Sequence, residues 1–131
     1  MLSLKFCALS EAKGMVIKMN KLDKIESKYI KTDIPEFRPG DKVRVRIKIS
    51  EENKDRIQVL EGIVIRIKGS GINKTFTVRK ISFNNVGVER TFLLNSPVIQ
   101  SIEKVNEGAV RRAKLYYLRD KIGKKSKIKS K

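Results

Sequence analysis

The sequence predicts a mainly β protein whose central part is a small antiparallel barrel or sandwich, and three observations support this fold class. Segments between residues 42 and 105 alternate apolar and polar side chains with a period of two, which is typical of half-buried strands. Short turn-forming stretches separate these segments: EENKD, KGSGINK, FNNVG, LNSP and NEG. No helical pattern lies between them, and short strands at such close spacing favour an antiparallel barrel or sandwich.

One short helix and an extended linker are expected before the strands. In KLDKIESKYI, Leu22, Ile25 and Tyr29 follow one another at intervals of three and four residues, which predicts a short amphipathic helix. Pro35 and Pro39 disfavour a helical backbone in the residues before them, so the chain is expected to enter the first strand in an extended conformation.

The first strand, DKVRVRIKIS, has the most regular pattern, with four aliphatic side chains on one face and four cations on the other. The aliphatic residues expected to face the core are Val43, Val45, Ile47 and Ile49, and the outward cations are Lys42, Arg44, Arg46 and Lys48. Two interpretations of the basic face stay open. It is either a solvated face that keeps the strand from pairing with other chains, or a surface that binds phosphates. Its uniform charge in a net-basic chain favours the second.

Four further strands are expected. RIQVLEGIVIRIKG places Ile63, Ile65 and Ile67 on one face, and Gly62 in the middle of this run indicates a bulge or a bend. KTFTVRKIS, VGVERTFLL and PVIQSIEKV supply three more short strands. The sequence therefore predicts five strands, which is enough for a small closed sheet.

Two isolated acids and one loop have simple interpretations. Glu61 and Glu89 lie in otherwise basic strands, and each is expected to pair with a neighbouring arginine rather than to act as an acid or base. The loop KGSGINK is glycine-rich and basic but lacks the spacing of a Walker loop. Contact with RNA or a partner through this loop, and a bare hairpin turn, are about equally consistent with its sequence.

The C-terminal end carries most of the excess charge, because residues 109–131 hold ten of the 31 Lys and Arg but one of the 14 acids. VRRAKLYYLRDKI predicts one helical piece that Gly123 ends, and KKSKIKSK is too charged to fold alone. Three interpretations stay open: a solubilising tail, a membrane-binding segment and a nucleic-acid arm. The missing apolar stripe disfavours the membrane. Tyr116 and Tyr117 either stack on bases and sugars or dock the arm on the barrel.

The amino-acid composition limits the kinds of partner and of active site that this protein can have. A formal net charge of +17 on 131 residues indicates an anionic partner, and a polyphosphate is the strongest candidate. No stretch approaches the roughly 18 apolar residues of a spanning helix. The chain has one cysteine, Cys7, and no histidine, which excludes an internal disulfide and disfavours the usual zinc sites and Ser-His or Cys-His nucleophiles. We expect no cofactor, no metal, no small-molecule substrate and no enzymatic activity.

Five long blocks of the sequence resemble one known family. PEFRPGDKVRVRIKI, RIQVLEGIVIRIKGSG, FTVRKIS, GVERTFLLNSPVIQSI and GAVRRAKLYYLRDKIGKKSKIK are similar to the bacterial large-subunit ribosomal proteins of the L-nineteen family, from about Lys21 to about Lys129. The resemblance implies an SH3-like β-barrel with a short N-terminal helix and a basic C-terminal helical or extended tail. It implies a structural constituent of the large ribosomal subunit that binds large-subunit rRNA.

The resemblance also implies partners and a location. The protein would contribute to an intersubunit bridge with small-subunit rRNA near the aminoacyl-tRNA region. Its neighbours would be large-subunit proteins three and fourteen. It would lie in the cytoplasm, in the ribosome, and an organelle ribosome stays open. The rival hypothesis is a free SH3-like or OB-like RNA-binding chaperone that is not stably on the ribosome. An anionic-membrane protein and a nucleic-acid enzyme are disfavoured, the latter because the acids are scattered.

Particular residues are expected to contact RNA. The residues that match the family blocks are Arg38, Arg79, Lys80, Arg90, Arg111, Arg112, Lys114, Tyr116, Tyr117 and Arg119. Further basic residues of the first strand, the KGSGINK loop and the chain end complete the predicted RNA-binding set: Arg44, Arg46, Lys68, Lys74, Lys121, Lys124, Lys125 and Lys127. The tail that carries most of them is expected to be disordered alone and to fold on RNA.

Four parts are expected along the chain: an extra segment at 1–18, a helix and linker at 19–35, the barrel at 36–108 and the basic extension at 109–131. Met19 coincides with the position at which the sequences of family members usually start. The segment before it is either a genuine extension or the result of an upstream in-frame start, with Met15 as a second candidate start.

Overall fold

A computed structural model describes residues 20–131, so the predictions for residues 1–18 and for Cys7 fall outside the described part. The described part begins with α1 (Lys21–Glu26), which runs into a 3-10 turn (Ser27–Tyr29). Five strands follow: β1 (Lys42–Glu51), β2 (Lys54–Lys68), β3 (Thr75–Ile81), β4 (Gly87–Leu93) and β5 (Ile99–Asn106). The C-terminal segment, residues 109–131, contains two 3-10 helices, Tyr116–Asp120 and Gly123–Ser126.

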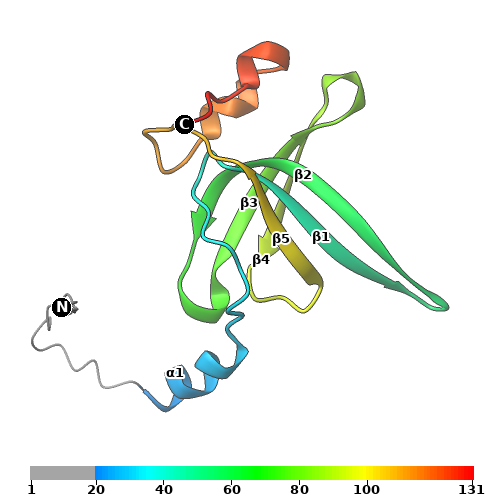
Figure 1. Cartoon of the computed structure of the whole chain (residues 1–131), viewed down its shortest axis with the longest axis vertical. Helices are drawn as coiled ribbons and strands as arrows, with labels where there is room; N and C mark the ends of the chain where they lie inside the picture. The colour runs from blue at the N-terminus through cyan, green and yellow to red at the C-terminus, as the bar shows by residue number, and fades with distance from the viewer. Residues whose placement is uncertain (1–19) are drawn as a thin grey trace, which may run out of the picture.

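All five strands form one antiparallel sheet in the order β4-β3-β2-β1-β5 (Figure 1). The first four strands follow one another as hairpins, and β5 returns to pair with β1. Within residues 20–131, β4 and β5 are the two edges of the sheet, and no ladder joins them. The structure therefore confirms a mainly β, antiparallel fold with a short N-terminal helix, but it shows an open sheet where the sequence predicted a closed barrel.

The main hydrophobic core lies on one face of the sheet, and β1 supplies its centre. Val43, Val45 and Ile47 are 0, 0 and 3 % exposed, and Ile49 is partly buried against the same cluster. Phe76 of β3 packs beside them with 1 % exposure. The strict alternation in β1 predicted this facing correctly, because alternate side chains of a strand point to opposite faces.

Strand β2 faces differently from the prediction, because it changes register at a bulge. The pairing with β3 shifts between Val64 and Arg66, so Ile65 is the extra residue. Val64 and Ile65 are therefore both fully buried, the first in the main core and the second in a separate cluster. Ile63 packs with Ile65, whereas Ile67 packs against the main core. The expected common face of the three isoleucines was wrong.

Gly62 does not form the bulge that the sequence suggested at this position. Its pairing with Val43 of β1 is regular. A Cβ atom at Gly62 would lie 2.5 Å from the carbonyl oxygen of Arg79 and 2.7 Å from a methyl group of Val78. The absence of a side chain thus lets β3 approach β2 closely.

Helix α1 forms where the sequence predicted it. The Asn20 amide donates to Oδ2 of Asp23 over 2.9 Å, an interaction typical of a helix N-terminus. Leu22, Ile25 and Tyr29 are 69, 54 and 65 % exposed, so the helix does not bury its apolar face against the rest of residues 20–131.

The linker after this helix crosses one end of the sheet in an extended conformation, as its prolines predicted. Lys31 Nζ donates to the carbonyl oxygens of Ser96 and Ile99, both at 2.7 Å, which ties the linker to the start of β5. Farther along, the ring of Phe37 meets the ring of Phe76 edge-on, with 5.3 Å between centroids. The linker thereby closes one end of the main core.

Candidate nucleic-acid interface

The C-terminal segment folds back onto the sheet at the end opposite to α1 (Figure 1). Leu115 and Leu118 are 0 and 2 % exposed and form the second cluster with Ile65. The Leu115 amide donates to the carbonyl oxygen of Ile65 over 2.9 Å. The expected single helix was wrong, since this amide bonds to a strand carbonyl instead of a helical one. Two short 3-10 helices form in its place.

The last residues of the described chain also dock, although their composition predicted no folding alone. Gly108 and Ser130 form an antiparallel bridge, and the Ala109 amide donates to the carbonyl oxygen of Lys129 over 2.9 Å. Ile128 packs beside the second cluster. The structure thus shows a docked segment where the sequence predicted a disordered one, because spaced apolar residues give a basic segment enough anchors.

Tyr116 and Tyr117 are both half-buried beside cations. Arg66 Nη1 donates to the Tyr116 hydroxyl over 3.1 Å, and the guanidinium carbon of Arg119 lies 4.7 Å from the Tyr116 ring centroid. The hydrogen bond from Arg66, together with nearby positive charges, holds the pKa of Tyr116 below its ordinary value. Tyr117 lies within 5.5 Å of Arg112 and 4.9 Å of Lys121. Each ring thus helps to dock the segment and to position its cations. Base stacking by these rings stays a prediction.

An ion-pair network fastens the segment to the hairpin of β3 and β4. Glu89 accepts hydrogen bonds from Arg79 Nη1 at 3.1 Å and from Arg119 Nε at 3.0 Å. Arg79 Nη2 also donates to the carbonyl oxygen of Arg119 at 3.3 Å, and the Arg79 side chain is only 11 % exposed. A side chain at Gly87 would collide with this guanidinium. The network confirms that Glu89 pairs with arginine, and it gives Arg79 a structural role that the sequence did not predict.

The outward face of β1 is less basic than its own sequence, because acids from both neighbouring strands lie among its cations. Arg44 Nη2 lies 3.1 Å from Glu61 of β2, and Arg46 Nη2 lies 2.8 Å from Glu103 of β5. The other pairs of this face are Lys42–Glu61 at 2.6 Å, Lys48–Asp55 at 2.7 Å and Arg44–Glu103 at 3.7 Å. Hydrogen bonds from Lys42 and Arg44 hold the pKa of Glu61 below its ordinary value. The predicted pairing of Glu61 is confirmed.

The remaining predicted cations do not form one cluster. Lys68 and Lys74 flank the β2–β3 turn, beside the linker and far from the C-terminal segment (Figure 1). Lys80 and Arg90 lie on β3 and β4, with Arg90 5.5 Å from the ring of Phe92. The cations of the C-terminal segment are all exposed: Arg111, Arg112, Lys114, Arg119, Lys121, Lys124, Lys125 and Lys127. This segment is therefore the densest basic surface that the predicted residues form.

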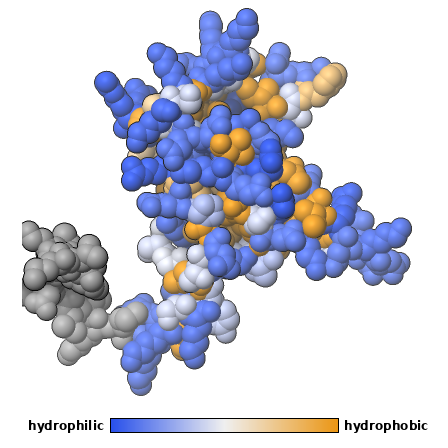
Figure 2. Space-filling view, viewed as in Figure 1, coloured by the Kyte–Doolittle hydropathy of each residue, from blue (hydrophilic) through white to orange (hydrophobic). Residues whose placement is uncertain are grey.

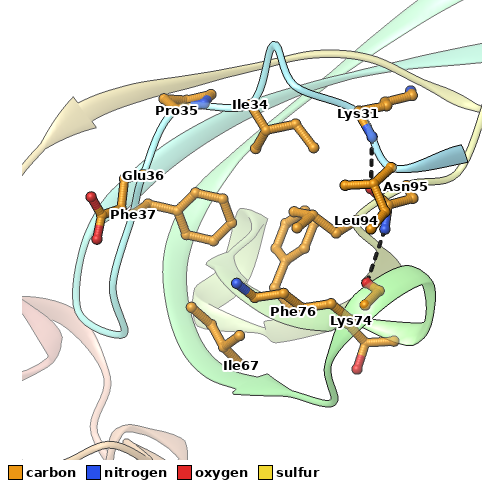
Figure 3. Close-up of a pocket in the computed structure, with 13 residues that line it drawn as sticks. Lys31, Ile34, Pro35, Glu36, Phe37, Ile67, Lys74, Phe76, Leu94 and Asn95 are labelled. Carbon is orange, nitrogen blue, oxygen red and sulfur yellow. Dashed lines mark hydrogen bonds between the residues drawn. The ribbon is translucent and has the colours of Figure 1, made fainter. Parts of the chain in front are cut away.

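Among the hollows on the surface of residues 20–131, two differ clearly in character. Hydrophilic side chains cover most of the face shown in Figure 2, with apolar ones in small separate patches. A pocket of about 380 Å³ opens between the linker and the β2–β3 turn, and Phe37, Phe76 and Leu94 surround it (Figure 3). At its rim, the Lys31 amide donates to Asn95 Oδ1 over 3.2 Å (Figure 3). Its largely apolar wall is unsuited to a phosphate.

The second hollow is polar and has a volume of about 830 Å³. It lies between the turn before β1 and the beginning of the C-terminal segment, and Arg38, Arg111 and Arg112 line it. Lys104 and Lys131 line it too, and sequence reasoning missed both. Neither sits in a distinctive motif, and the folding back of the chain end is what brings Lys131 beside residues far from it in sequence.

Two other kinds of site find no support within residues 20–131. This part of the chain contains no group of three or more carboxylate, cysteine or histidine side chains placed to hold a metal ion. None of its helices combines the length and the hydropathy required to cross a bilayer.

One family model matches the whole described part of the chain. Residues 20–131 match the family model described as Ribosomal protein L19. The match includes α1, the whole sheet and the docked C-terminal segment, so it covers every element described above.

Proposed function

Because the chain belongs to the ribosomal protein L19 family, whose members are structural proteins of the large ribosomal subunit that bind ribosomal RNA, we propose that its C-terminal segment anchors it to large-subunit rRNA. The sheet holds this segment in place, and the exposed cations of residues 109–131 neutralise phosphates where RNA strands approach one another. The protein thus acts as a structural element and not as an enzyme.

One observation supports this proposal above the others. The segment carries ten cations and one acid, yet Leu115 and Leu118 bury it against Ile65. Docking by leucines leaves the charged heads of the neighbouring arginines and lysines in water. A surface that is already ordered loses less conformational entropy on binding than a disordered arm does. Each phosphate contact then displaces condensed counterions, which makes binding to free RNA strongly salt-dependent.

The finer assignments of the proposal rest on what the resemblance to the family implies. The protein contributes to an intersubunit bridge with small-subunit rRNA near the aminoacyl-tRNA region. It lies beside large-subunit proteins three and fourteen, in the cytoplasmic ribosome. Its sheet is an SH3-like barrel in which the edge strands β4 and β5 do not pair. The paired face of β1, with Arg44 and Arg46 already bound to acids, makes a smaller contribution to RNA binding than the C-terminal segment.

The double substitution Arg111→Glu with Arg112→Glu tests the anchoring role. Both side chains are exposed, so the variant should fold normally while it loses its place in large subunits. Lysates of cells that express tagged variants are sedimented through sucrose at high salt, and the protein is quantified in each fraction. Lys28→Glu with Lys54→Glu is the matched control, because it makes the same charge change at exposed sites outside the segment.

The distribution of each variant in the gradient decides the outcome. We expect that the wild type and the control variant sediment with large subunits and full ribosomes in near one-to-one amounts. The double variant should stay at the top of the gradient. Normal incorporation of the double variant would contradict the anchoring role. A wild-type protein at the top of the gradient would instead favour a free RNA-binding chaperone.

A further inference from the structure

Hydrogen bonds from the backbone hold in place the bottom of the polar hollow, whose volume is about 830 Å³. Asp41 is 5 % exposed, and its two carboxylate oxygens accept from the amides of Arg38 at 2.9 Å and Gly108 at 3.0 Å. Asp41 thus joins the turn before β1 to the start of the C-terminal segment. Since both of its oxygens accept backbone hydrogen bonds, its charge is partly satisfied inside the protein.

Two glycines bring these two backbone segments into direct contact. A Cβ atom at Gly108 would collide with the carbonyl group of Gly40. Gly40 has a positive φ of 99°, and a Cβ atom there would lie 2.7 Å from a methyl group of Val110. Only glycine fits such positions without strain. The shape of the hollow is therefore set before any ligand arrives.

The rim of the hollow is basic. Five cations line it: Arg38, Lys104, Arg111, Arg112 and Lys131. Three acids line it as well, but Asp41 is buried and Glu107 pairs with Lys104 at 2.5 Å. Among residues 20–131, the three arginines and Lys131 take part in no ion pair. Their positive charge faces the hollow and the solvent, with Glu36 as the only opposing acid in its described lining that is neither buried nor paired.

A smaller hollow adjoins the polar hollow along the backbone of residues 109–112. Its volume is about 380 Å³, and it shares Arg111 and Arg112 with the larger one. Tyr117 and Lys121 complete its wall, with the guanidinium carbon of Arg112 5.5 Å from the Tyr117 ring centroid. A guanidinium held against an aromatic ring presents a flat surface on which an unpaired base can stack.

We propose that an unpaired RNA strand crosses the ridge formed by Arg111 and Arg112. Its sugar-phosphate backbone lies in the larger hollow, where Arg38 and Lys131 bind phosphate oxygens. A base next to those phosphates stacks on Arg112 in the smaller hollow. This inference rests on the proposed function, since it specifies where and in what form the rRNA is held.

The dimensions and the chemistry of the site favour a nucleotide strand over a free anion. The larger hollow falls within the range of about 300–1,000 Å³ that binds small organic molecules, which exceeds the needs of a single phosphate. Arginine forks bind phosphate oxygens in pairs. Inorganic phosphate has no ring that could stack on the surface beside the phosphate site. A single strand, in which bases and phosphates alternate, contacts both parts.

The salt dependence of RNA binding tests the proposal. The full chain is titrated with deproteinised large-subunit rRNA between about 50 and 200 mM salt. Arg38→Gln with Lys131→Gln should lower the log–log salt slope by about 1.4 units, because each phosphate contact with single-stranded RNA contributes about 0.7. Lys28→Gln with Lys54→Gln, which removes two exposed cations outside the hollow, should leave the slope unchanged.

A photocrosslinking experiment independently tests whether the bound RNA strand lies in the larger hollow. Cys7→Ser with Ala113→Cys leaves one cysteine, at an exposed residue that lines the larger hollow. A benzophenone attached there should crosslink to unpaired nucleotides of the rRNA, and far more strongly than one attached through Asn53→Cys at the β1–β2 turn.

The outcomes separate this inference from the function on which it rests. If the wild type binds the rRNA and Arg111→Glu with Arg112→Glu weakens binding, but Arg38→Gln with Lys131→Gln keeps the wild-type slope, the hollow is not the strand site and the proposed function stands. Crosslinks that fall only in duplex regions of the rRNA would also contradict the proposal that the bound strand is unpaired. If the wild type fails to bind the rRNA at all, the proposed function itself is wrong.

Discussion

The guanidinium of Arg119 binds the carboxylate of Glu89 through two nitrogens, with Nε 3.0 Å from Oε1 and Nη2 3.0 Å from Oε2. The same carboxylate accepts from Arg79 Nη1 at 3.1 Å. Glu89 therefore links a strand residue to the C-terminal segment, in a chain whose charge is otherwise strongly positive. Two of the residues expected to bind RNA are thus engaged within the protein.

We expect Glu89→Gln to loosen the C-terminal segment. The neutral amide has one acceptor oxygen where the carboxylate has two, so the two-nitrogen contact with Arg119 is lost, and the mostly buried Arg79 loses its only ionic partner within residues 20–131. Hydrogen exchange should become several-fold faster at the amides of residues 115–121 while the strands keep their protection. Glu103→Gln, which removes a half-buried acid on β5, is the control and should leave this exchange unchanged.

Removing a leucine from the second cluster should destabilise the protein measurably. Leu115 is fully buried, and Leu115→Ala should lower the free energy of unfolding by about 2–4 kcal/mol, through lost burial and the cavity left behind. Urea denaturation followed by circular dichroism measures the change. Ile122→Ala, at a residue that is 51 % exposed, should cost less than about 0.5 kcal/mol. Equal effects of the two substitutions would show that the segment is not docked in solution.

A charge placed in the main core should abolish folding. Val45 is 0 % exposed at the centre of β1, and Val45→Asp buries a carboxylate with no partner, at a cost of about 4 kcal/mol or more. We expect the loss of a cooperative thermal transition. Val59→Asp makes the same exchange on the other face of the sheet, at a residue that is 49 % exposed, and it should melt close to the wild type.

The carboxylates paired on the outer face of the sheet predict an acid-sensitive fold. Hydrogen bonds from Lys42 and from Lys48 hold the pKa values of Glu61 and Asp55 below their ordinary values of 4.5 and 3.8. A lowered pKa means that the unfolded chain takes up protons first as the pH falls. The stabilisation from these pairs is therefore complete above about pH 5 and is lost as the pH falls through the lowered pKa values.

Chemical denaturation at a series of pH values measures this loss. Between about pH 5 and pH 3, the wild type should lose stability more steeply than Glu61→Gln, which has no carboxylate to protonate at this position. Above about pH 5 the two curves should run parallel, since neither chain titrates there through this residue. A variant curve as steep as that of the wild type would show that these pairs do not form in solution.

Alternation along single strands predicted much of the fold, because it depends only on neighbouring residues. The inward facing of Val43 and Val45 and the pairing of Glu61 with an arginine followed from that pattern. The bulge at Ile65 did not, since its reason lies in Leu115, fifty residues later, which needs an apolar partner on the opposite face. An alternating isoleucine run contains no signal for such a partner.

The candidate site was predictable in composition but not in arrangement. The excess of cations in residues 109–131 indicated an RNA-binding surface. The neutralising acids of the β1 face come from two other strands, so they could not be read from β1 itself. Lys131 lines the same hollow as Arg38 only because residues 129–131 return beside Gly108. Contacts between such distant residues follow from the packing and not from local patterns.

The bulge that buries Val64 and Ile65 on opposite sides of β2 also sets an order of events during translation. Residues 42–106 leave the synthesising ribosome before residues 109–131, so the sheet can assemble while Ile65 still faces water. The nascent protein therefore passes through a stage in which the main hydrophobic core is formed and the side chain of Ile65 is still exposed. The arrival of Leu115 and Leu118 covers that side chain, and the basic surface takes its final shape only after they have docked.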